Sequence, residues 1–184
     1  IVIILLLAVA LYILSTTGFF RDIAEYSQAT DIQSIALTGP EDFALSRTDS
    51  FLIISASHRR FSVSSEGFRD GLYLIDLKSN AMQPRLLSGF MPETFSPHGI
   101  SMIPDGDGYQ LMAVSHPDGE QSIELFHFNG ETLTHERTLQ DPSLIMPNDL
   151  VLTAPDRFYV TNDHRYPDGF MRLVEDYGGL ALCN

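Results

Sequence analysis

The chain has 184 residues, enough for one ordinary domain, and a formal net charge of −13. Such an acidic chain is not expected to bind nucleic acid, because phosphate binding needs a basic face. Its hydrophobic content of 44% is enough for a packed core and argues against a disordered chain.

The first segment, Ile1–Phe20, carries no charge and predicts an apolar helix. Twenty helical residues span about 30 Å, the thickness of the apolar core of a bilayer. We therefore expect residues 1–20 to be a signal-anchor, a transmembrane helix that holds the following domain at a membrane, outside the cytoplasm. A cleaved signal peptide, which would leave a secreted domain, and a buried helix are the alternatives. A cleavage site needs small residues, and no Ala-x-Ala follows Leu14 in the next sixteen residues.

Residues 21–184 predict an all-β domain. Short runs rich in β-branched and aromatic residues alternate with Gly, Pro, Asp and Asn, as in strands joined by turns. The clearest runs are Phe51–Ser55, Gly71–Leu77, Gln110–Ser115, Ile123–Phe128 and Arg157–Thr161. Asn129-Gly130 predicts a hairpin turn with both residues at positive φ. A helical pattern is expected only near Met171–Tyr177.

Three stretches of the chain share one order of features: Glu41–His58, His98–His116 and Asn148–His164. Each begins with a polar residue, continues with an apolar run, a turn containing Asp and a second apolar run, and ends in histidine. A strand-built unit repeated at about this interval is typical of a β-propeller, whose blades number four to eight. With about three repeats visible, residues 21–184 are expected to be the N-terminal half of a truncated propeller domain. Inner strands start near the central channel, so the first residues of the three repeats are expected to converge there.

Two of the repeats begin with oxygen-rich pairs, Glu41-Asp42 and Asn148-Asp149. Carboxylate and amide oxygens suit calcium, although paired acids at a strand start more often serve as turn or capping residues. The run Asp105–Gly108 lacks the glutamate that an EF-hand loop needs at its twelfth position, so a hairpin turn is expected there.

Three histidines, His98, His116 and His164, stand at strand ends of the repeats. A zinc site is not indicated, because the sequence contains no His-x-x-His or His-x-x-x-His spacing. A pair of histidines can instead pass a proton, since imidazole titrates near neutrality. The chain also lacks the Gly-x-Ser-x-Gly of serine hydrolases and a Gly-rich phosphate loop.

Five segments in chain order resemble the paraoxonase/arylesterase family of calcium-dependent lactonases. They are GPEDFAL (Gly39–Leu45), SPHGIS (Ser96–Ser101), VSHPDG with SIELFHF (Val114–Phe128), PNDLVL (Pro147–Leu152) and FYVTNDH (Phe158–His164). The resemblance implies a six-bladed propeller that holds two calcium ions and hydrolyses small lactones and aryl esters. An uncleaved apolar N-terminal segment is also a feature of that family.

The resemblance implies roles for residues of the active site. His98 and His116 match the family's histidine dyad, proposed there as the base that activates water. Glu41 and Asn148 match ligands of the catalytic calcium. Further ligands, an Asn and an Asp-Asn pair, lie downstream in the family, so these 184 residues alone are expected to be inactive.

A second set of matches concerns the structural calcium and the mouth of the site. The structural-calcium matches are Asp42, Asp149 and the backbone carbonyl of Ile100. A segment near the active-site mouth is matched by Asn162, Asp163 and His164.

Two other functions fit the strand pattern. One is a related six-bladed propeller hydrolase of the gluconolactonase or strictosidine-synthase-like type, against which SPHGIS and the two Asn-Asp matches argue. The other is a non-catalytic propeller that acts as a binding scaffold. Such a scaffold could have lost its calcium ligands, whereas Glu41, Asn148 and both dyad histidines are present.

Overall fold

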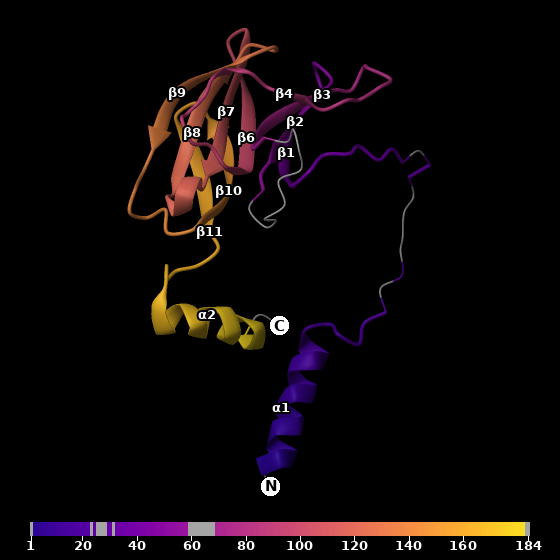
Figure 1. Cartoon of the computed structure of the whole chain (residues 1–184), viewed down its shortest axis with the longest axis vertical. Coiled ribbons are helices and arrows are strands. Elements are labelled where there is room, and N and C mark those ends of the chain that lie inside the picture. The colour runs from indigo at the N-terminus through magenta and orange to yellow at the C-terminus, as the bar shows by residue number, and fades with distance from the viewer. Residues whose placement is uncertain (1, 23, 25–28, 31, 59–68, 183–184) are drawn as a thin grey trace. The chain divides into compact units, whose positions relative to one another are not determined.

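The computed structural model describes residues 2–22, 24, 29–30, 32–58 and 69–182, which form two compact units (Figure 1). The β unit, Ser34–Asp163, contains every strand of the described chain. The helical unit, Ile1–Gln33 with His164–Asn184, contains the two α-helices. Each unit is described by itself.

The first sheet of the β unit has four antiparallel strands in chain order. They are β1 (Pro40–Ser46), β2 (Phe51–Ala56), β3 (Gly71–Asp76) and β4 (Arg85–Leu86). The β-branched and aromatic run FLIIS forms β2, as the sequence predicts, and β2 pairs with β1 on one side and β3 on the other.

The second sheet repeats this arrangement and adds one strand. Its four antiparallel strands are β6 (Pro97–Asp105), β7 (Gly108–Ser115), β8 (Ser122–Phe128) and β9 (Leu133–Leu139). The short strand β5 (Gly89–Phe90) pairs in parallel with β9. It covers the outer edge of the sheet, where exposed backbone groups would otherwise invite pairing with another chain.

A third sheet consists of the hairpin β10 (Pro147–Ala154) and β11 (Arg157–Asn162). Each of the three sequence repeats therefore folds as an antiparallel hairpin, which confirms the predicted order of strand, turn and strand. The described chain is mostly β with antiparallel sheets, as expected. The number of blades stays a prediction.

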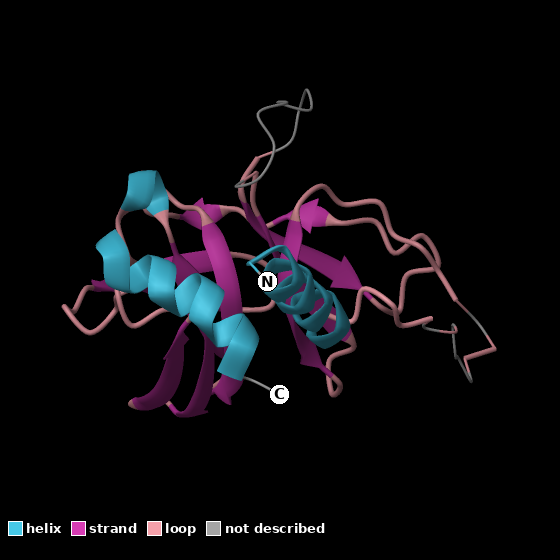
Figure 2. Cartoon of the chain, turned by 90° about the horizontal axis from the view of Figure 1, so that it is seen from below, coloured by secondary structure: helices cyan, strands magenta, loops and turns pink. Residues whose placement is uncertain are grey.

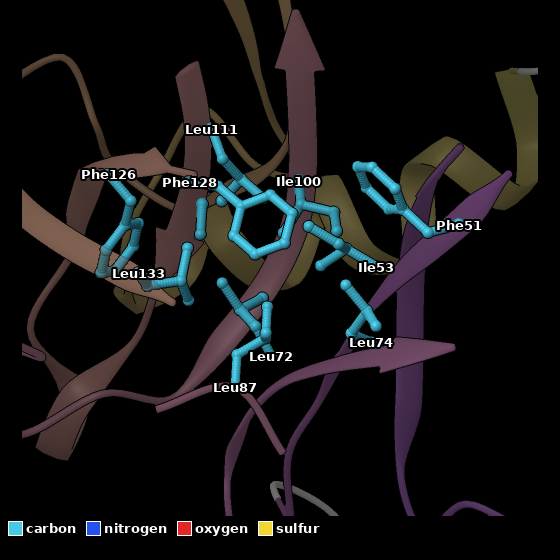
Figure 3. Packing of buried hydrophobic residues seen from close by; sticks show 11 residues of the cluster. Phe51, Ile53, Leu72, Leu74, Leu87, Ile100, Leu111, Phe126, Phe128 and Leu133 are labelled. Atoms are coloured by element: carbon cyan, nitrogen blue, oxygen red, sulfur yellow. The ribbon is translucent and has the colours of Figure 1, made fainter. Parts of the chain in front are cut away.

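The core lies in two layers, one on each face of the second sheet. Figure 3 shows the first layer, in which Phe51, Ile53 and Leu72 of the first sheet pack with Leu111 and Phe128 of the second. The other layer joins the second sheet to the β10–β11 hairpin. A strand buried on both faces must be apolar at successive positions, which explains the unbroken run of buried residues in β7. Each fully buried leucine or phenylalanine contributes about 1.5–3 kcal/mol.

The N-terminal helix is shorter than the sequence predicts. Helix α1 spans Val2–Thr16, 15 residues, and is about 22 Å long. It ends where Gly18 takes a φ of 75° and the N–H of Phe19 bonds to the carbonyl of Leu14, a Schellman cap. The expected 20-residue transmembrane helix is therefore corrected: in the described part of the chain, no helix has the length and apolarity that crossing a membrane requires.

The second helix of the helical unit confirms the helical pattern expected near its centre. Helix α2 spans Gly169–Leu182 (Figure 2, where helices are cyan). It begins at Gly169, which has a φ of 79°. Its first turns present the exposed side chains of Phe170 and Leu173.

Candidate active site

The first strand of each repeat begins with a proline and a β-bulge. The register shifts follow Pro40, Pro97 and Pro147. Proline lacks the N–H needed for pairing and is found at the first position of strands, and a bulge turns a side chain out of the regular ladder. The residues placed in the three bulges are Glu41, His98 with Gly99, and Asn148. A β-bulge at a strand start therefore holds each of three predicted site residues.

The three strand starts lie against one another. A Cβ atom added to Gly99 of β6 would lie 2.5 Å from the backbone oxygen of Asn148 and 2.5 Å from the Cα of Asp149 in β10. On the other side of β6, the N–H of Ile100 donates to Oδ2 of Asp42 at 2.8 Å. The first residues of β1, β6 and β10 therefore adjoin one another at one end of the β unit.

The predicted dyad lies at this end. Nδ1 of His98 is 3.0 Å from Oε2 of Glu41, and each of the two side chains is 16% exposed. The ring centroids of His98 and His116 are 5.6 Å apart, with an angle of 57° between the ring planes. The carboxylate of Glu41 thus lies within ion-pair distance of Nδ1 of His98.

Ser55, a buried serine that sequence reasoning missed, joins the backbones of the two strands at the site. Ser55 is fully buried in β2, its Oγ donates to the carbonyl of His98, and it accepts from the N–H of Asp42 at 3.0 Å. The hydroxyl therefore joins the backbone of β1 to that of β6 beneath the two bulges. No sequence signal pointed to it, since Ser55 and His98 lie 43 positions apart.

The second dyad residue, His116, is held through its backbone and through its ring. Its N–H donates to the carbonyl of Ser96 at 3.0 Å, and its Nδ1 contacts Oε1 of Gln121. Ser96 also donates from Oγ to Asp70, whose other oxygen lies 3.1 Å from Nδ1 of His58. The pair of His58 and Asp70 is a second contact that sequence reasoning did not foresee.

The third repeat contributes an amide and two carboxylates. Nδ2 of Asn148 donates to Oδ2 of Asp163 at 2.8 Å, which places Asp163 beside the third bulge. Oδ1 of Asp149 accepts from the N–H of Leu150 at 2.7 Å. Asn162 instead closes the loop before β10: its Oδ1 accepts from the N–H of Met146 at 3.0 Å. The structure thus brings Asp163 to the site residues, whereas the amide of Asn162 serves the backbone.

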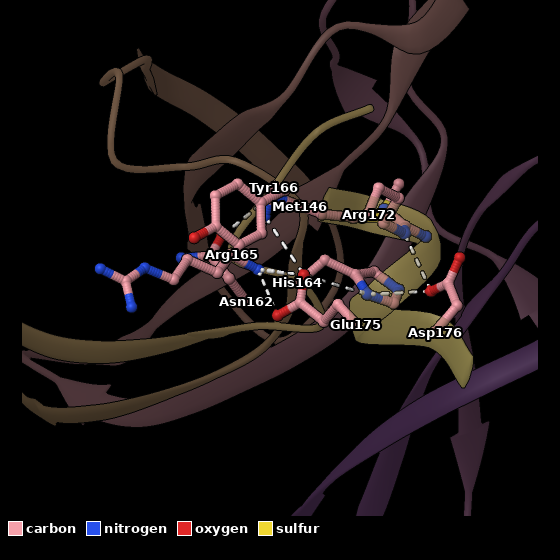
Figure 4. A network of polar contacts seen from close by, with 8 residues as sticks. All are labelled: Met146, Asn162, His164, Arg165, Tyr166, Arg172, Glu175 and Asp176. Atoms are coloured by element: carbon pink, nitrogen blue, oxygen red, sulfur yellow. Dashed lines mark hydrogen bonds and ion pairs between the residues drawn. The ribbon is translucent and has the colours of Figure 1, made fainter. Parts of the chain in front are cut away.

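His164 belongs to the helical unit. Its Nδ1 lies 3.4 Å from Oδ1 of Asp176 and 3.9 Å from Oε2 of Glu175, both on α2 (Figure 4). The same Glu175 carboxylate accepts from the N–H of Arg165 at 2.9 Å. These contacts hold the chain that enters α2 against the first turns of the helix.

The gathered donors fit calcium in kind. Carboxylates of β1 and β10, an amide and a strand-start backbone are hard oxygen donors, which calcium prefers. Within the residues that the structure describes, no three side chains of His, Cys, Asp and Glu come together as a metal-holding group. The strand starts thus offer part of an oxygen ligand set, built from amide and backbone oxygens as well as carboxylates.

A cavity of about 610 Å³ lies at the opposite ends of β1 and β6 from the candidate active site. It is lined by Asp49 of the β1–β2 turn, Asp107 of the β6–β7 turn and Tyr109. None of the predicted site residues lines it, so it is separate from the candidate active site.

Comparisons with known proteins indicate the family of the chain. The arylesterase family model matches residues 60–184, more than half of the chain. Serum paraoxonase/arylesterase 2 of Rattus norvegicus is 37% identical over 120 residues, which are 62% of this chain and 34% of that protein. Serum paraoxonase/arylesterase 1 of Homo sapiens is 41% identical over 97 residues, which are 51% of this chain and 27% of that protein.

Similarity of the same extent is found in a bird. Serum paraoxonase/arylesterase 2 of Gallus gallus is 38% identical over 119 residues, 61% of this chain and 34% of that protein. The chain spans about a third of the length of the curated relatives that it matches. On the match of the family model, the chain belongs to the arylesterase family.

Proposed function

We propose that the protein is a calcium-dependent hydrolase of lactones and aryl esters. The observation that supports this proposal is that three adjoining strand starts carry a carboxylate, a histidine and an amide in three equivalent bulges, with the ring of His116 beside that of His98. The names of the relatives, paraoxonase and arylesterase, support the same class of reaction.

The dyad would supply the base. With Oε2 of Glu41 3.0 Å from Nδ1, His98 would carry its hydrogen on Nδ1, and Nε2 would take a proton from water as the water oxygen attacks the acyl carbon. The bond from the acyl carbon to the leaving oxygen then breaks, and the proton returns to that oxygen. His116 lies beside His98 and stabilises the protonated ring. Water is consumed, one ester bond is broken, and no covalent intermediate with the protein is needed.

Calcium would be held by oxygens of the strand starts. Glu41 and Asn148 would bind the catalytic ion, and Asp42, Asp149 and the carbonyl of Ile100 the structural ion. A bound calcium supplies a Lewis acid that polarises the carbonyl group. The hydrogen bond from the N–H of Ile100 to Oδ2 of Asp42 joins the starts of β1 and β6.

The full-length protein tests the proposal. Chelation should abolish hydrolysis of a simple lactone and an aryl ester, and added calcium should restore part of it. His98→Gln should lower turnover about a hundredfold or more, the usual size of a general-base contribution. His116→Gln should lower turnover less, because His116 acts on His98.

A matched control uses a histidine outside the site. His127 lies near the far end of β8, where it faces Gly108, so His127→Gln should leave turnover unchanged. Full activity in excess chelator would overturn the calcium mechanism. Near wild-type turnover in both dyad variants would remove His98 as the base. A protein that binds but hydrolyses no ester would instead favour the scaffold function.

A further inference from the structure

The loop between β7 and β8 folds a glutamine side chain back onto the dyad. The loop contains one 3-10 turn, η1 (Pro117–Gly119), and Gly119 has a φ of 88°, which favours glycine. This tight return brings Oε1 of Gln121 to Nδ1 of His116. The resemblance to the paraoxonase/arylesterase family implies roles for the two histidines of the dyad and for calcium ligands, and none for Gln121.

The orientation of the glutamine amide is determined by the backbone. Nε2 of Gln121 donates to the carbonyl of Gly119 at 3.2 Å. Only the nitrogen of the amide can donate, so the oxygen is the atom that faces His116. An amide oxygen and a bare ring nitrogen would both be acceptors, so Nδ1 of His116 must carry the hydrogen.

We propose that Gln121 is a positioning residue that fixes His116 as the Nδ1–H tautomer and so makes Nε2 the atom that can accept, from His98, the proton that His98 takes from water. This inference rests on the proposed function for its catalytic consequence, but the tautomer itself does not depend on turnover. His98 has a comparable neighbour, because Oε2 of Glu41 lies 3.0 Å from its Nδ1. Each dyad ring therefore has an oxygen acceptor near its Nδ1.

The anchoring has a chemical consequence. Nε2 of His116 is buried, and the ring lies 5.6 Å from that of His98. In the opposite tautomer Nε2 would already carry hydrogen and could not accept another. With Nδ1–H bonded to Gln121, His116 can gain a proton at Nε2 without changing its existing hydrogen bond. The amide of Gln121 thus keeps hydrogen off Nε2 of His116, so that this atom can accept a proton, and it stabilises the imidazolium that forms.

Two variants and one control separate this role from a merely structural one. Gln121→Met keeps the length of the side chain and removes the acceptor, and Gln121→Glu keeps an acceptor. Glu120→Gln changes the exposed neighbour on the same loop and serves as the control. Each full-length protein is labelled with ¹⁵N-histidine, and ring spectra are recorded well above the ordinary titration range of imidazole, beside kcat, KM and thermal unfolding.

His116 should carry hydrogen on Nδ1 and none on Nε2 in three proteins: the wild type, Gln121→Glu and Glu120→Gln. Gln121→Met should show a mixture of tautomers, and its kcat should fall about tenfold with KM unchanged, the effect of about one hydrogen bond. A wild-type spectrum with hydrogen on Nε2 would overturn the inference, as would an unchanged tautomer in Gln121→Met. If the protein hydrolyses no ester, the proposed function fails, and the spectra still decide the tautomer.

Discussion

Replacing Gly99 by alanine would push apart the two strand starts that hold the candidate active site. The backbone angles of Gly99 suit any residue, so the effect of the added methyl group is one of space alone. That group would lie 2.5 Å from the backbone of both Asn148 and Asp149, where ordinary contacts begin at 3.4 Å. The atoms concerned belong to the backbone and to a short side chain, so the start of β6 must move away from that of β10.

The expected magnitudes follow from this displacement of about 0.9 Å. Overpacking of this kind destabilises a protein by about 1–3 kcal/mol. A misplacement of about 1 Å at reacting groups can lower turnover about a hundredfold. Gly99→Ala should therefore lower the free energy of unfolding, weaken calcium binding and lower kcat together.

A second glycine gives a matched control for the loss of stability. A methyl group on Gly108 would lie 2.5 Å from the backbone oxygen of Phe128, a clash of the same size at the far end of the β6–β7 hairpin. Gly108→Ala should lose similar stability in urea unfolding followed by circular dichroism, the chain having no tryptophan, while folded protein keeps its kcat. If both variants keep or lose activity equally, the contact of β6 with β10 does not position the site.

Three further predictions concern single contacts and the N-terminus. Ser55→Ala should lower the free energy of unfolding by about 1–3 kcal/mol, because the His98 carbonyl and the Asp42 N–H lose a buried partner; urea unfolding measures it, and an unchanged midpoint would refute it. Burial and the hydrogen bond to Asp49 raise the pKa of Tyr109 above its usual value of 10.0, so folding loses stability as the pH rises above about 10. Tyr109→Phe should remove that part of the alkaline loss, and an identical slope of stability against pH in both proteins would contradict this. The segment Ile1–Phe20 is expected to remain attached in the mature protein, which N-terminal sequencing decides against a start beyond Phe20.

Local sequence signals predicted the hairpins well and their details less well. The turn expected at Asp105–Gly108 is present, with Gly106 at a φ of 59°. The hairpin at Asn129-Gly130 is also present, but only Gly130 has positive φ. The side-chain oxygen of Asn129 instead accepts from the N–H groups of Glu131 and Thr132, so the residue acts through its amide.

The strand starts of the site were predictable, because a proline recurs there in each repeat. The contacts between segments that lie far apart in the sequence were not predictable. The prolines before Glu41, His98 and Asn148 were visible and mark strand starts, yet periodicity alone does not reveal a bulge. Likewise Gly18 could have signalled the end of α1, because glycine favours a helix C-terminus. The contact of Ser55 with His98 depends on how two sheets pack, which no local pattern contains.

In the three bulges, the backbone determines where a side chain lies, and the residue type determines its chemistry. The residues Glu41, His98 and Asn148 stand outside the regular pairing of their hairpins, so replacing one of these side chains leaves the neighbouring strand pairs intact. The same backbone device presents a carboxylate at Glu41, an imidazole at His98 and an amide at Asn148. New combinations of acid, base and ligand could therefore be selected at this end of the molecule one residue at a time, without a new fold for each reaction.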